Sequence, residues 1–149
     1  MIERDTDEPS GYNATWVTPD DETLRKINKN LKDVDPRLRY ADALQIQEDS
    51  DTLTTRLLVL GQVTEELFSN PIIPTLILPE KSIAQPFGYM ALPMDPIKNS
   101  RFLIVLFKLA GLDQNYYTQT RDAFLEKANQ RFPAAGLTLF PPYPQQNHQ

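Results

Sequence analysis

The strongest hydrophobic pattern lies near the end of the chain, where a continuous apolar run precedes a helical stripe. The run Arg101–Leu109 (RFLIVLFKL) carries charges only at its start and near its end. A strand that is covered on both faces has this pattern, because neither set of alternating side chains contacts water. The run therefore predicts a central strand.

The residues after this strand predict an amphipathic helix. Asn115 can cap its first turn. The apolar positions that follow share one helical face, namely Tyr117, Phe124, Leu125, Ala128 and Phe132. Pro133 cannot continue the helix and Gly136 permits a left-handed exit, so the helix should end there. Residues 137–140 are apolar and β-permissive, and they predict a short final strand before three prolines.

Two further helices are predicted upstream. The first covers residues 19–32, with Thr18 as a cap and Pro19 at the first helical position. Its apolar residues share one face, namely Leu24, Ile27 and Leu31. Ser50 can cap the second helix, whose stripe consists of Leu53, Leu57, Leu60, Thr64 and Leu67.

Two segments allow more than one interpretation. Gly61 weakens the second helix by about 1 kcal/mol relative to alanine, and a strand over residues 54–60 is the competing interpretation. Leu38, Ala41 and Leu44 suit a short helix after Asp35-Pro36, whereas residues 44–48 (LQIQE) alternate like a strand.

Six prolines divide residues 71–96 into short apolar pieces. The pieces 75–78 and 89–92 suit edge strands or an extended arm, because each proline removes a hydrogen-bond donor from a strand ladder. A segment of this kind is suited to lying across a neighbouring subunit. An irregular surface loop with two edge strands is the alternative interpretation.

Length and composition predict one domain of the α+β class, a small mixed sheet with two or three helices, over residues 12–140. An acidic arm at residues 1–11 precedes it, and a proline- and glutamine-rich tail at residues 141–149 follows. The arm is polar and charged, so we expect it to contribute little to the stability of the isolated fold.

No stretch approaches the roughly 18 uncharged apolar residues of a membrane span. The N-terminus lacks the basic start and the apolar middle of a signal peptide. The chain has no cysteine and therefore no thiolate metal site or disulfide framework. We expect a cytoplasmic or virion location.

Residues 25–39 hold the main cluster of basic side chains, with Asp33 and Asp35 interleaved among Arg25, Lys26, Lys29, Lys32, Arg37 and Arg39. A nucleic-acid patch is usually more basic and carries stacking aromatic residues. We interpret the cluster as a solvated helix face and do not expect nucleic acid as a partner.

The sequence contains no pattern typical of a catalytic, cofactor-binding or metal site. His148 is the only histidine and lies in the polar tail, where nothing in the sequence would hold it in a triad or metal site. The five glycines form neither a phosphate loop nor a dinucleotide fingerprint. Glu48, Asp49 and Asp51 cluster at a turn, but they lack the offsets of a calcium loop and are better explained by helix capping.

Residues 100–145 resemble the end of the cytoplasmic domain of small-conductance mechanosensitive channels. The resemblance consists of a strand, an amphipathic helix, an alanine-glycine turn, a short apolar strand and a proline-aromatic-proline-glutamine signature. The residues that carry the last three features are Ala134, Ala135, Gly136, Leu137, Thr138, Leu139, Pro142, Tyr143, Pro144 and Gln145. A weaker resemblance covers residues 49–71, with an acidic turn, a helix and an Asn-Pro exit.

This chain departs from the family pattern in two ways: Phe140 and Pro141 lengthen the terminal strand, and no pore helix is present. The resemblance implies a vestibule-like domain that assembles as a ring, and it favours the strand interpretation of residues 44–48.

These observations predict a non-catalytic structural subunit of a larger, ring-like assembly, such as a virion tail or connector component. A detached relative of the channel vestibule domain and an enzyme with an unrecognised carboxylate site are the alternatives. The expected partners are further copies of the chain or other subunits, bound by an apolar contact that changes little with salt. The candidate interface residues are Trp16, Ile72, Ile73, Ile77, Phe87, Tyr89, Met90, Pro142 and Tyr143.

Overall fold

The computed structural model describes residues 11–69, 87–94 and 100–144, which form an α+β fold, as the sequence predicts. The described residues do not include Ile72, Ile73, Ile77, the predicted piece at residues 75–78 or His148. The elements, in chain order, are β1 (Ala14–Val17), α1 (Asp21–Val34), β2 (Leu38–Gln47), α2 (Ser50–Ser69), β3 (Phe87–Pro93), β4 (Arg101–Leu109), α3 (Gln114–Arg131) and a 3₁₀ turn (Pro133–Ala135).

The four described strands form one sheet in the order β1-β2-β4-β3, and every pair in it is antiparallel. The prediction of a mixed sheet is therefore wrong. Strands β1 and β2 are antiparallel neighbours, and so are β3 and β4, whereas β2 and β3 both pair with β4, which lies between them. Hydrophobic runs carry no information about strand direction. The predicted piece at residues 89–92 lies in β3, which is an edge strand as expected.

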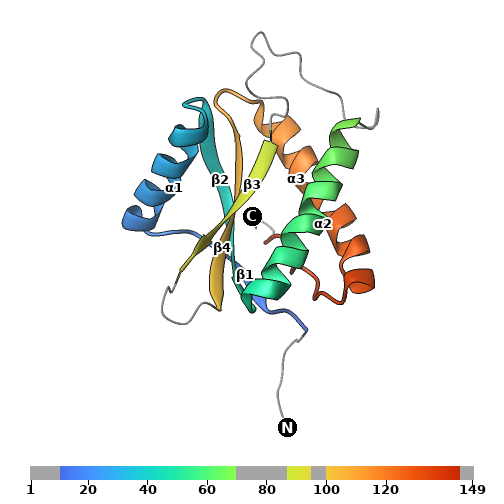
Figure 1. Ribbon diagram of the computed structural model, residues 1–149. Helices are drawn as coiled ribbons and strands as arrows, with labels where there is room; N and C mark the ends of the chain where they lie inside the picture. Colours follow the sequence, from blue (N-terminus) through green and yellow to red (C-terminus); the bar gives the residue numbers. More distant parts are fainter. Residues whose placement is uncertain (1–10, 70–86, 95–99, 145–149) are drawn as a thin grey trace, which may run out of the picture.

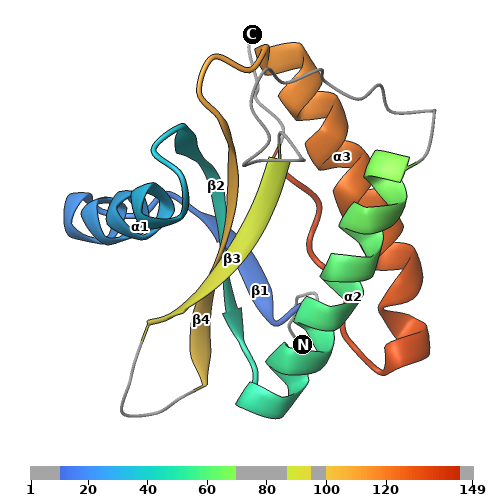
Figure 2. The same cartoon turned by 45° about the horizontal axis from the view of Figure 1, so that its top comes forward.

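Helix α1 covers one face of the sheet, and α2 and α3 cover the other (Figures 1 and 2). Strand β4 is central, as its apolar run predicts, and residues 102–106 are all buried. Its side chains alternate between two cores: Phe102, Ile104 and Leu106 pack towards α2 and α3, and Leu103 and Val105 pack towards α1. Both faces of the strand are thus covered.

The predicted helical stripes are confirmed. The five predicted positions from Tyr117 to Phe132 are all buried. In α2, Leu53, Leu60, Thr64 and Leu67 are buried and Leu57 is half-buried, and in α1, Ile27 and Leu31 are buried and Leu24 is half-buried. Within the described residues, no helix combines the length and apolarity that a membrane crossing needs.

The predicted caps are wrong by one or two residues, because an aspartate takes each position. The backbone N–H groups of Thr23, Thr52 and Tyr116 donate to the carboxylates of Asp20, Asp49 and Asp113. Thr18, Ser50 and Asn115 do not serve as these caps. A carboxylate accepts the same hydrogen bond as a hydroxyl and also interacts favourably with the positive end of the helix dipole.

The structure settles both ambiguous segments. Residues 38–47 form strand β2 rather than a short helix, because they pair with β4 along almost its whole length. Residues 54–60 lie in α2 rather than in a strand. Gly61 is tolerated in that helix, and a Cβ at this position would lie 3.2 Å from the Tyr89 hydroxyl.

The prediction of a strand at residues 137–140 is wrong. Gly136 has the expected left-handed conformation, with φ of 77°. After it residues 137–140 form no strand, and the main chain of Phe140 pairs with a side chain instead. The Phe140 N–H donates to Asn129 Oδ1 at 2.8 Å, and Asn129 Nδ2 donates to the Phe140 carbonyl oxygen at 3.1 Å. Residues 137–144 are called the C-terminal segment below.

Candidate functional site

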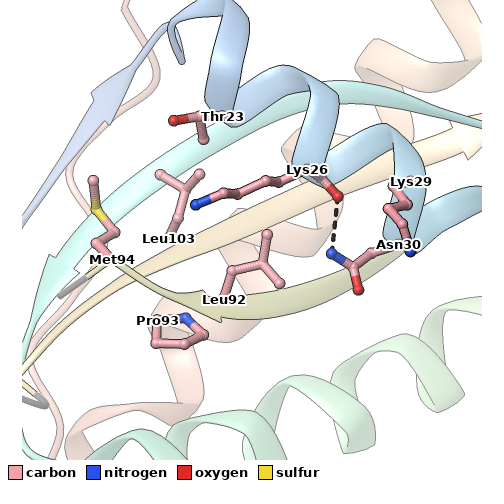
Figure 3. A pocket seen from close by; sticks show the side chains of 8 residues that line it. All are labelled: Thr23, Lys26, Lys29, Asn30, Leu92, Pro93, Met94 and Leu103. Atoms are coloured by element: carbon pink, nitrogen blue, oxygen red, sulfur yellow. Dashed lines mark hydrogen bonds between the residues drawn. The ribbon is translucent and has the colours of Figure 1, made fainter. Parts of the chain in front are cut away.

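A groove of about 380 Å³ lies between α1 and the end of β3 (Figure 3). Its floor is apolar, and its α1 side is polar and cationic. The residues that line it are Thr23, Lys26, Lys29, Asn30, Leu92, Pro93, Met94 and Leu103. Figure 3 shows the Lys26 side chain extending from α1 towards Leu103.

The alternation of β3 side chains supplies the floor of this groove. Met90 and Leu92 are half-buried and pack on the α1 side of the sheet, whereas Phe87, Tyr89 and Ala91 pack on the side of α2 and α3. Met94, which follows the strand, is 42 % exposed. The end of β3 therefore presents apolar side chains that α1 does not fully cover.

The outer edge of β3 carries main-chain groups with no strand partner among the described residues. The Met94 N–H donates to the Arg101 carbonyl oxygen at 2.9 Å, so the main chain of Met94 faces β4. In an antiparallel pair the direction of these groups alternates. The N–H and C=O groups of Tyr89 and Ala91 therefore point away from β4, towards the free edge.

The positive charge of α1 lies beside this edge. Arg25, Lys26, Lys29 and Lys32 are exposed along the helix. Lys29 pairs with Asp33 at 3.7 Å, but both side chains are at least 70 % exposed, so the pair contributes little to stability. The lysine ammonium groups thus remain accessible to a bound anion.

A second feature is a polar cluster around Asp42, at a bulge in β2. Tyr117 Oη and Tyr143 Oη each donate to the Asp42 carboxylate at 2.6 Å. Arg121 Nη1 lies 3.5 Å from the same carboxylate, and its guanidinium lies 3.7 Å from the centroid of the Tyr143 ring. The cluster joins β2, α3 and the C-terminal segment.

Burial and the neighbouring carboxylate change the acidity of these tyrosines. Burial, together with the hydrogen bond to Asp42, raises the pKa of Tyr143 to about 12 and raises the pKa of Tyr117 further. Both phenols therefore stay protonated at neutral pH and act as donors. Each oxygen of the Asp42 carboxylate accepts a hydrogen bond from one of these tyrosine hydroxyls. Since Tyr143 belongs to the C-terminal segment, Asp42 is suited to holding that segment against β2.

We expect the stability of the fold to fall as pH rises from about 10 to about 12. The unfolded tyrosine releases its proton near its ordinary pKa of about 10, whereas folded Tyr143 retains its proton up to about 12. The unfolded state binds fewer protons in this window, so deprotonation favours unfolding. Urea melts at about pH 8 and about pH 11 measure the loss, and Tyr143→Phe should reduce it. An equal alkaline loss in this variant would contradict the role given to Tyr143.

A third cluster surrounds Arg56, whose side chain is fully buried in α2. Its Nε and Nη2 atoms donate to the two carboxylate oxygens of Glu48 at 2.8 and 2.9 Å. Its Nη1 donates to the Thr138 carbonyl oxygen at 2.9 Å. The guanidinium lies 4.6 Å from the Phe132 ring centroid and 5.2 Å from that of Phe140. This cluster also fastens the C-terminal segment.

Sequence reasoning missed both polar clusters. Arg56 had a detectable signal, since it follows Leu53 by three residues and precedes Leu60 by four, which places a charge in the apolar stripe. Asp42 had no comparable signal, because its partners Tyr117 and Tyr143 are far away along the chain.

The predicted interface residues that the structure describes occupy three different places. Phe87 is 2 % exposed and packs inside the core, so its side chain is not available at the surface of this domain. Tyr89 and Met90 are half-buried in β3, next to the free edge. Trp16 is half-buried and donates to the Pro141 carbonyl oxygen at 3.0 Å, with Tyr143 packed edge-on against its ring. Pro142 is exposed beside them.

Comparison of the chain with protein-family models, with curated proteins and with solved structures gave no match. The resemblance to mechanosensitive channels therefore stays a prediction. The described residues contain no group of three or more histidine, aspartate or glutamate side chains that could hold a metal ion.

Proposed function

We propose that this protein is a non-catalytic structural subunit that self-associates into a larger assembly by strand addition at the outer edge of β3. The observation that carries the proposal is a strand edge at Tyr89 and Ala91 that no other described strand pairs with, combined with the partly covered apolar side chains of Met90, Leu92 and Met94. An added strand would gain main-chain hydrogen bonds and cover that apolar surface.

The two edges of the sheet differ in a way that favours β3. Strand β1 has four residues, and its Trp16 side chain is bound to Pro141 of the C-terminal segment. Strand β3 has seven residues and reaches the groove beside α1. A longer edge offers more main-chain groups to a partner, and exposed edges of this kind are templates for pairing with another chain.

The polar clusters support a structural role over a catalytic one. The hollow of about 360 Å³ beside Asp42 contains a carboxylate, but each of its oxygens already accepts a hydrogen bond from a tyrosine hydroxyl. Glu48 is likewise paired at both oxygens by Arg56. A general acid or base must reach the reacting group of a substrate, and these carboxylates are instead used to position the C-terminal segment.

The decisive variant is Ala91→Pro. The Ala91 N–H faces the free edge, so proline removes a donor that a partner strand would use and leaves the ladder with β4 intact. We expect the wild-type chain to sediment as an oligomer and Ala91→Pro to sediment as a monomer with nearly unchanged thermal stability.

The matched control is Ala14→Pro. The Gln47 N–H donates to the Asn13 carbonyl oxygen, so alternation places the Ala14 N–H on the outer side of β1. This variant makes the same change at the opposite edge and should remain an oligomer. A wild-type chain that is monomeric at its highest soluble concentration would contradict the proposal, and so would an Ala91→Pro oligomer of wild-type size.

A further inference from the structure

We infer that the strand added at β3 is the acidic segment Glu3–Asp7 of a second copy of this chain, held in the groove by Lys26 and Lys29. The inference rests on the proposed function, because it names the segment that pairs with the β3 edge. Residues 1–10 contain Glu3, Asp5, Asp7 and Glu8 against a single basic residue, Arg4. The groove has the opposite charge on its α1 side and an apolar floor on its β3 side.

The spacing of the acids matches the spacing of the lysines. In an extended chain, alternate residues point to the same side, so Glu3, Asp5 and Asp7 share one face at intervals of about 6.8 Å. Lys26 and Lys29 are three residues apart on a helix, which separates their Cβ atoms by about 5–6 Å. A strand added to β3 directs one of its faces towards α1, where two neighbouring acids would meet the two lysines.

We assign the segment to another copy, because in its own chain it would have to cross to the opposite edge of the sheet. Asn13 is tied to Glu48 and Thr138 on the side of α2, and Figures 1 and 2 show the chain entering β1 from that side, away from α1. A strand outside β3 would lie four strand spacings from β1, or about 19 Å. The six residues from Asp7 to Asn13 span at most about 22 Å when fully extended, so its own chain would have to be drawn taut to reach the groove, whereas a second copy can supply the segment without this constraint.

Exchange of this segment makes a head-to-tail contact, in which each copy donates acids from the β1 edge of its sheet and accepts them at the β3 edge. Such heterologous contacts close into rings when the rotation permits and otherwise extend into filaments. The contact is partly ionic, unlike the salt-insensitive contact expected from the apolar pattern. Raising the salt concentration from 0.1 M to 1 M shortens the Debye length from about 10 Å to about 3 Å and should weaken the oligomer.

Charge reversal tests the inference directly. The readouts are sedimentation of the full chain and fluorescence anisotropy of a labelled peptide of residues 1–10 titrated into a chain that lacks these residues. Lys26→Glu with Lys29→Glu should weaken peptide binding about tenfold or more and make the full chain monomeric. Glu3→Lys with Asp5→Lys and Asp7→Lys, introduced into the same chain, should restore the oligomer.

The matched control reverses two other cations on the same helix. Arg25→Glu with Lys32→Glu changes the net charge of α1 equally, but neither residue lines the groove. This variant should bind the peptide within about twofold of wild type. Equal weakening by both pairs of substitutions would show a non-specific charge effect and overturn the inference.

Deletion of residues 1–10 separates this inference from the proposed function. A monomer after deletion, with unchanged thermal stability, supports both. An oligomer that survives the deletion but is lost in Ala91→Pro overturns the role of the acidic segment and leaves strand addition at β3 intact. A wild-type chain that is already monomeric overturns both.

Discussion

Replacing Arg56 by alanine is expected to lower the free energy of unfolding by about 3–5 kcal/mol. The side chain is 0 % exposed and makes four hydrogen bonds to Glu48 and Thr138. Its removal leaves the Glu48 carboxylate, which is 5 % exposed, buried without its cation. A buried charge without a partner carries the full desolvation cost, and the cavity between Phe132 and Phe140 adds to it.

A double variant separates the effect of losing the ion pair on the free energy of unfolding from the effect of the cavity. Arg56→Met with Glu48→Gln retains much of the side-chain volume and removes both charges, so it should be less destabilised than Arg56→Ala. Urea melts of the wild type and the two variants provide the three free energies. A loss below about 1 kcal/mol for Arg56→Ala would show that the pair does not hold the C-terminal segment to α2.

Phe124→Ala is expected to cost about 3–5 kcal/mol in the free energy of unfolding. Phe124 is 0 % exposed and lies between α3 and the sheet. Its ring centroid lies 5.1 Å from that of Phe87 and 6.2 Å from that of Tyr89. Truncation removes contacts with both aromatic residues and leaves a cavity that the rigid sheet cannot fill.

The control for this variant is Glu126→Ala, an exposed position in the same helix. It should change the free energy by less than about 0.5 kcal/mol. Chemical denaturation measures both variants. If Phe124→Ala lost no more stability than Glu126→Ala, the helix would not pack against β3 through this side chain.

The sequence by itself determined the elements that depend on local periodicity. The apolar run of β4 and the stripes of α1, α2 and α3 are each built from residues close together in the chain, so their spacing shows which face is buried. The α+β class follows from the same evidence. The helix ends were displaced by a residue or two, because several neighbouring residues can act as caps and only the folded backbone selects one.

The tertiary structure decided the features that join distant residues. Residues 38–44 have a helical alternative, but pairing with β4 makes them a strand. The C-terminal segment is apolar enough for a strand, yet Asn129 and Arg56 satisfy its main-chain groups in place of a neighbouring strand. In both cases a long-range hydrogen-bond partner overrides the local preference.

The groove was also a product of the tertiary structure. The lysines of α1 and the apolar residues of β3 that line the groove were both visible in the sequence, but they are more than 60 positions apart and follow different periodicities. Only the sheet order, which places β3 at an edge, brings Leu92 and Met94 beside Lys26. Strand order depends on which hydrophobic faces can be covered simultaneously, and that is a property of the whole packed chain.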